Sequence, residues 1–129
     1  MATFTSDKAV STVPARYLHA GAVTEVCTYT HSALASSGDV LQLVKVDPGA
    51  IVTAIVVKST DTAVKIEIGD GVDPNRYLAT TAAGNTENVA LVNLGYEYSA
   101  ADTVDITFGT SAATTAAVVQ AIVTVVYDN

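Results

Sequence analysis

Residues 39–78 decide the fold, and they read DVLQLVKVDPGAIVTAIVVKSTDTAVKIEIGDGVDPNRYL. Two apolar runs within this stretch, at 40–46 and 50–58, are joined by the Asp-Pro-Gly of residues 47–49. This tripeptide predicts a tight turn, because proline presets a negative φ and glycine accepts a positive one. The run at 64–68 then alternates apolar and polar residues, which is the period of a half-buried β-strand. The stretch therefore predicts an all-β fold.

Further strand patterns lie on both sides of this stretch, at 22–30, 76–80, 90–98, 103–108 and 116–127. The strict alternation at 103–108 predicts that Val104, Ile106 and Phe108 are buried beneath Thr103, Asp105 and Thr107. The run at 116–127 has apolar residues on both faces, which argues against a solvated sheet edge. About eight short strands separated by turn signals are typical of an antiparallel β-sandwich. We predict an eight-stranded jelly roll, with another sandwich topology as the alternative.

The composition is that of one folded domain rich in strand. Of the 129 residues, 50% are hydrophobic and 15% are charged, which excludes intrinsic disorder and predicts a sparsely charged surface. The 20 valines and 18 threonines far outnumber the 7 leucines, and β-branched side chains favour strands. Residues 1–20 lack sustained periodicity and contain Pro14, so we predict an extended N-terminal arm before a β-sandwich domain at 21–129.

The charge pattern argues against several classes of partner. The formal net charge is −7 and no cluster of lysine or arginine occurs, so no nucleic-acid partner is expected. No apolar run approaches the ~20 residues of a membrane span, and residues 1–8 lack a secretory signal pattern. We therefore expect no membrane partner and synthesis in a cytoplasm. Cys27 is the single cysteine, and its apolar strand predicts a buried thiol.

Asp70 and Asp73 are the candidate metal ligands. They lie in the predicted loop at 69–75, and with Asp102 and Asp105 they would offer oxygen ligands to calcium if the fold brought them together. The regular calcium-loop spacing and its closing glutamate are absent. We therefore favour aspartates that cap turns over aspartates that bind calcium, and we expect no cofactor.

No catalytic constellation accompanies these residues, so we predict that the protein is not an enzyme and has no small-molecule substrate. A cupin-type metal site needs a close pair of histidines, whereas His19 and His31 would meet only across a sheet or a symmetry axis. Sugar binding usually needs an exposed aromatic ring. The tyrosines predicted at loop edges are Tyr17, Tyr77, Tyr96 and Tyr98. We favour half-buried packing for these rings over a carbohydrate site.

Residues 38–50, GDVLQLVKVDPGA, resemble the small virion proteins of tailed bacteriophages. Those proteins commonly show a strand that runs into a segment like IGDGVDPNRYL at 68–78. A Gly-Tyr segment like that at 95–96 and a strand like 102–107 follow in them. The resemblance covers residues 38–108 and rests on structural turns, not on catalytic signatures.

This resemblance implies a capsid decoration (cement) or head-associated protein, made in the host bacterial cytoplasm and bound to the major capsid protein on the outside of a phage shell. A homotrimer attached by binding alone is the expected form. The runner-up is a receptor-binding or tail-fibre head domain that recognises a bacterial surface glycan. We predict a shell-facing contact in residues 1–20 and a subunit contact in 116–127. The predicted partner-binding residues are Phe4, Val13, Pro14, Tyr17, Val119, Val123, Val125 and Tyr127.

Overall fold

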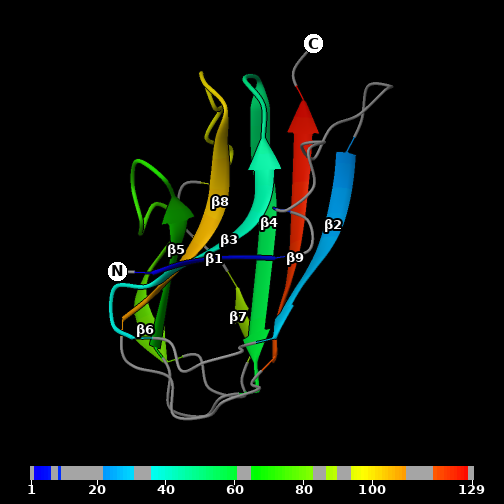
Figure 1. The fold of residues 1–129 in the computed structure, drawn as a ribbon. Coiled ribbons are helices and arrows are strands. Elements are labelled where there is room, and N and C mark those ends of the chain that lie inside the picture. The colour runs from blue at the N-terminus through cyan, green and yellow to red at the C-terminus, as the bar shows by residue number, and fades with distance from the viewer. Residues whose placement is uncertain are drawn as a thin grey trace.

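The computed structural model describes residues 2–6, 9, 22–30, 36–60, 65–82, 87–89, 94–109 and 118–127. These residues form nine β-strands (Figure 1). Their bounds are β1 Thr3–Thr5, β2 Ala22–Thr30, β3 Val40–Val46, β4 Ala50–Ser59, β5 Lys65–Asp70, β6 Leu78–Ala82, β7 Glu87–Val89, β8 Asp102–Phe108 and β9 Val118–Tyr127. No helix within the described ranges has the length and apolarity to cross a membrane. The all-β prediction is confirmed.

The strands form a sandwich of two sheets, with the orders β1-β3-β8-β5-β6 and β2-β9-β4-β7. Every described pairing is antiparallel except that of β1 with β3. From β2 onward, successive strands alternate between the two sheets, except that β5 and β6 lie in the same sheet. The first and last of these eight strands, β2 and β9, pair with each other. This order is that of an eight-stranded jelly roll, so the predicted topology is confirmed.

The turn at 47–49 forms as the sequence predicts, whereas the pattern at 90–98 does not become one strand. Gly49 has a φ of 90°, and the Ala50 N–H donates to the Asp47 carbonyl at 3.1 Å. Strand β7 ends at Val89, before the segment 90–98 that the sequence predicts to be a strand. Within that segment, Glu97 makes only an isolated bridge to Ile51. Gly95, with a φ of 96°, turns the chain within the pattern and prevents a continuous strand.

The core lies between the two sheets and follows the predicted alternation. Val104, Ile106 and Phe108 of β8 are buried, and so is Cys27 of β2. Strand β9 lies between β2 and β4 in the middle of its sheet, which confirms that it is not an edge (Figure 1). A row of buried side chains from this strand therefore packs against the opposite sheet.

The first strand, β1, lies on the edge of the five-stranded sheet, parallel to β3. Phe4 packs its ring against Tyr29 and Phe108, at centroid distances of 5.4 and 6.4 Å. The Ser6 N–H donates to the Gln42 carbonyl at 2.8 Å. Most of the predicted arm at 1–20 lies outside the described residues, so its division from the domain stays a prediction.

Candidate functional site

The loop between β5 and β6, residues 71–77, folds back over the outer face of its sheet. The Tyr77 N–H donates to the Ile68 carbonyl at 2.9 Å, and the Asp70 N–H donates to the Asp73 carbonyl at 3.0 Å. A Cβ atom on Gly69 would lie 2.1 Å from that Asp73 oxygen, so only glycine permits this close approach. The loop thus covers the sheet beside Gly69.

The Asp70 side chain holds this loop in place through hydrogen bonds and an ion pair. Its Oδ1 accepts hydrogen bonds from the Val72 and Asp73 N–H groups at 3.0 and 2.8 Å, and its carboxylate pairs with Arg76. The Tyr98 hydroxyl also donates to its Oδ2 at 3.2 Å. Burial opposes ionisation, but the Arg76 hydrogen bond and the two backbone N–H groups lower the pKa of Asp70 below its ordinary value. Asp70 is therefore an ionised and well-partnered carboxylate.

The predicted calcium ligands act as turn caps in this geometry. Asp70 caps the turn at 70–73, and the Asp73 carboxylate accepts from the Asn75 N–H at 3.4 Å. Among the described residues, no group of three or more His, Cys, Asp or Glu side chains could hold a metal ion. His19 and His31 of the cupin-type alternative lie outside the described residues.

Two of the loop tyrosines are structural. Tyr77 and Tyr98 are buried, and their hydroxyl oxygens lie 2.8 Å apart. Burial raises the pKa of Tyr77 to about 12 and also raises the pKa of Tyr98. Tyr96 is more exposed, but the Arg76 guanidinium lies 3.8 Å from its ring centroid and covers one face. The sugar-platform interpretation is thus wrong for Tyr77 and Tyr98, and Tyr17 lies outside the described residues.

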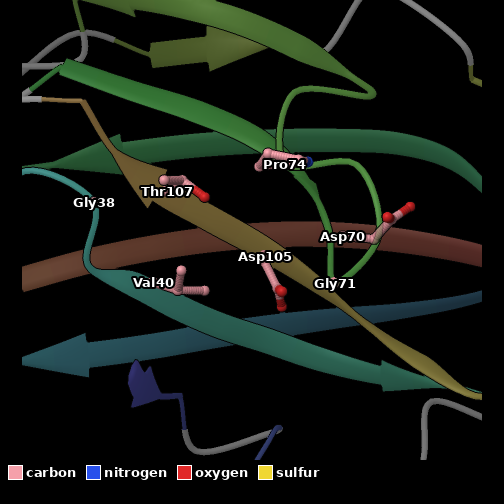
Figure 2. Close-up of a pocket in the computed structure, with 7 residues that line it drawn as sticks. All are labelled: Gly38, Val40, Asp70, Gly71, Pro74, Asp105 and Thr107. Atoms are coloured by element: carbon pink, nitrogen blue, oxygen red, sulfur yellow. The ribbon is translucent and has the colours of Figure 1, made fainter. Parts of the chain in front are cut away.

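A cavity of about 390 Å³ opens beside this loop, on the outer face of the five-stranded sheet (Figure 2). It is lined by Gly38, Val40, Asp70, Gly71, Pro74, Asp105 and Thr107. Asp105 is only 4% exposed, and its Oδ1 has no hydrogen-bond partner among the described residues. Burial, opposed by a hydrogen bond with Thr103 and reinforced by the charges of Asp102 and Asp70, raises the pKa of Asp105 to about 7.

The burial of Asp105 corrects the expectation that it lies on a solvated face. Its strand alternates as predicted, and Asp105 does point away from the core. However, it pairs in register with Gly69, and the returning loop covers that part of the sheet. The sequence contained only a weak signal that a loop would cover Asp105, namely the glycine at 69 and the Pro-Asn turn at 74–75.

The predicted subunit contact on β9 needs correction as well. Val119, Val123 and Val125 lie in the core, with at most 2% of their surface exposed, so they are not available to a partner. Tyr127 is half-buried and its hydroxyl accepts from the Asp47 N–H at 3.3 Å. Phe4 packs on the core, as described above. The remaining predicted contacts, Val13, Pro14 and Tyr17, lie outside the described residues.

The outward face of β2, β9 and β4 consists mainly of apolar and neutral side chains among the described residues. Val26, Ile122 and Val56 are paired in register and form an apolar row across the three strands. The other described outward side chains on these strands are Thr24, Thr28, Thr30, Val118, Gln120, Thr124, Val126, Ile51, Thr53, Ala54 and Lys58. None of them is acidic, although the chain has 13 acidic residues. We call this surface the acid-free face.

Comparison with known proteins finds likeness only at the level of structure. No family model and no curated protein matches the sequence. A chain in the capsid of Ralstonia phage GP4 is 14% identical and has a TM-score of 0.79, with 99% of each chain covered. A chain in the capsid asymmetric unit of cyanophage Pam1 is 18% identical, with a TM-score of 0.72 over 92% of this chain and 93% of that one.

A third similar chain comes from an acidic stable capsid structure of Helicobacter pylori bacteriophage KHP30. It is 15% identical, with a TM-score of 0.57, and the match covers 83% of this chain and 95% of that one. At these identities the likeness establishes a shared fold. The matches span most of each neighbour, so the whole sandwich is shared.

Proposed function

We propose that this protein is a structural component of a bacteriophage virion that decorates the outside of the capsid and acts by binding, without catalysis. The observation that carries this proposal is the end-to-end match of the jelly roll to chains in phage capsid structures. A capsid role also agrees with the turns at 38–50 and 68–78 that resemble small phage virion proteins. The partner is then the major capsid protein.

The acid-free face is suited to contact with a second copy of the chain. Two copies with a net charge of −7 repel each other wherever their carboxylates face one another. The outward side of β2, β9 and β4 offers apolar and neutral side chains instead, with Val26 46% and Ile122 42% exposed. We therefore assign the subunit contact to this face of β9 rather than to its buried valines, in a homotrimer.

Such a trimer would attach through the part of residues 1–20 that follows β1 in each subunit, because β1 itself pairs with β3 and its Phe4 packs on the core. Once one arm is bound, the next two bind as intramolecular events, so modest contacts give tight attachment overall. The same attachment would join neighbouring capsid subunits and resist expansion of the shell. Stabilisation would then follow from the geometry of attachment alone.

Co-sedimentation with empty shells of the source phage, assembled without this protein, tests the proposal. The wild-type protein is expected to bind saturably, and Val13→Asp in the predicted arm is expected to weaken binding at least tenfold. Val72→Asp provides a matched control, because Val72 is 83% exposed on the β5–β6 loop and the substitution is chemically identical.

Two results would contradict the proposal. Absence of wild-type protein from the shell pellet at all concentrations would remove the decoration function. Equal binding by the Val13→Asp variant and the wild type would remove the arm as the shell contact. Binding to host cells instead of shells would favour a receptor-binding domain.

A further inference from the structure

The cavity beside Asp105 combines an unpaired carboxylate oxygen with apolar walls. Asp105 is 4% exposed and its Oδ1 has no partner in the part of the chain that the structure describes, whereas such buried atoms are almost always hydrogen-bonded. The neighbouring Asp70 is already satisfied by Arg76, Tyr98 and two backbone N–H groups. Asp105 therefore borders the cavity with one buried acceptor that lacks a donor among the described residues.

We propose that this cavity binds an alkylammonium group, with the Asp105 carboxylate as its counterion. An ammonium supplies charged N–H donors, which form the strongest hydrogen bonds to a carboxylate. Val40 and Pro74 line the same cavity and match an alkyl stem, just as a lysine buries its methylene groups along apolar surface. The site is independent of the proposed capsid function.

The surroundings favour this ligand over a metal ion or an anion. Calcium needs six to eight oxygen ligands, and no group of three or more His, Cys, Asp or Glu side chains in the described part of the chain could hold a metal. An anion would face Asp105 and the nearby Asp102. The volume, about 390 Å³, lies within the range of ligand pockets and exceeds the ~30 Å³ that one water occupies.

The charges around Asp105 set the pH at which binding is strongest. Asp102 lies on the same strand, and Asp70 with its partner Arg76 lies in the loop. On the neighbouring strands, Glu67 of β5 and Lys45 of β3 occupy outward register positions. Only the ionised carboxylate attracts a cation. Since the pKa of Asp105 is about 7, affinity is expected to rise between pH 6 and about pH 8 and then level off.

Carboxyl ¹³C NMR of the full chain, titrated with n-butylammonium at a pH near 8, tests the site. We expect a saturable shift of the Asp105 resonance in the millimolar range, as suits a small ligand, and a lowered pKa of Asp105. Tetramethylammonium has the same charge but no N–H donor, so it is expected to leave the resonance unmoved.

Variants separate the site from nonspecific charge effects. Asp105→Asn is expected to abolish the n-butylammonium shifts of the Gly71 and Thr107 amides. Glu97→Gln removes one exposed carboxylate elsewhere and is expected to leave the binding unchanged. The proposal is overturned if n-butylammonium fails to move the Asp105 resonance, or if the Asp105→Asn variant shows the same amide shifts as the wild type.

Two probes identify where the ammonium comes from. A blocked Gly-Lys-Gly peptide represents a lysine side chain of a protein partner, and cadaverine represents a free diamine. Tighter binding of the peptide would assign the site to a partner's lysine, and tighter binding of cadaverine to a small amine. Failure of both would overturn the site but leave shell binding unaffected, since the two are measured separately.

Discussion

Asp70 and Asp105 line one cavity, yet their surroundings favour opposite protonation states. Asp70 receives hydrogen bonds from Arg76 and from backbone N–H groups, which lower its pKa despite burial. Asp105 has fewer partners, so burial dominates and raises its pKa to about 7. Two causes separate these nearby carboxyl groups: Asp105 is more strongly desolvated, and Asp70 has the hydrogen bonds and the Arg76 partner that Asp105 lacks.

Asp105→Asn is expected to stabilise the protein in a pH-dependent way. The folded state holds the Asp105 proton more tightly than the unfolded state, so wild-type stability falls as pH rises from about 4 to 7. The variant lacks this loss. The difference in the free energy of unfolding between the variant and the wild type is therefore expected to grow from near zero at acid pH to about 1–3 kcal/mol in favour of the variant at pH 8. Urea denaturation across this pH range measures it.

Glu97→Gln is the control for that series, because Glu97 is exposed. Its stability difference from the wild type is expected to stay within about 0.5 kcal/mol at each pH. A constant Asp105→Asn effect across the range would contradict the assignment of the raised pKa to Asp105.

Gly69→Ala is expected to disrupt the loop that forms the cavity wall. The added Cβ would lie 2.1 Å from the Asp73 carbonyl oxygen and 2.3 Å from a Pro74 backbone carbon, so the loop must move. We expect a loss of at least ~3 kcal/mol in the free energy of unfolding. Gly95→Ala is the matched control: Gly95 has a φ of 96° with nothing within 4 Å, so only ~1–2 kcal/mol is expected. Equal losses in urea denaturation would contradict this difference.

Among the elements, β1 is the smallest and depends most on side-chain packing. It pairs with β3 over three residues, and its Phe4 ring packs on Tyr29 and Phe108. Phe4→Ala is expected to cost about 1–3 kcal/mol, less than a fully buried phenylalanine would, because Phe4 is half-buried. Thr3→Ala, at an exposed neighbouring position, is expected to have little effect.

Hydrogen exchange locates the effect of Phe4→Ala within the fold. The Val40 N–H donates to the Ala2 carbonyl at 2.8 Å and depends on β1 remaining in place. Its protection is expected to fall in the variant more than that of amides in β9, which lies in the other sheet. Unchanged protection of Val40 would mean that β1 is held by contacts other than the Phe4 ring.

The strands that could be predicted are those whose side chains alternate against a core. Strands β2 and β3 have the expected bounds, and β8 buries the expected residues, because period-2 patterning directly reflects burial on one face. The sequence predicts a loop at 69–75, but its return over Gly69 could not be predicted, because that position depends on long-range packing of Tyr77 and Tyr98. Asp105 was missed for the same reason: its burial is created by a segment more than 25 residues away.

At the scale of the whole molecule, the distribution of charge decides which surface can be shared between copies. No described outward side chain of β2, β9 or β4 is acidic, and the nearest acidic positions, Glu87 and Glu97, pair with β4 at the edge of that face. Apart from Lys58, the described outward side chains of these strands are uncharged, and depletion of charge is typical of the core of a subunit contact. The opposite side of the sandwich carries the β5–β6 loop and the Asp105 cavity. The molecule therefore has one face suited to self-association and one suited to a cationic ligand.

Val26→Asp is expected to convert the proposed homotrimer into a monomer without unfolding it. Light scattering of the wild type is expected to give three times the 13.2 kDa of one chain. Val26 lies beside Ile122 in the apolar row, so an aspartate there would be buried without a partner in the assembled contact and would cost several kcal/mol per subunit. Val72→Asp makes the same change on the exposed loop and is expected to remain trimeric. A trimeric Val26→Asp variant would exclude the acid-free face as the contact, and a monomeric wild type would exclude the trimer itself.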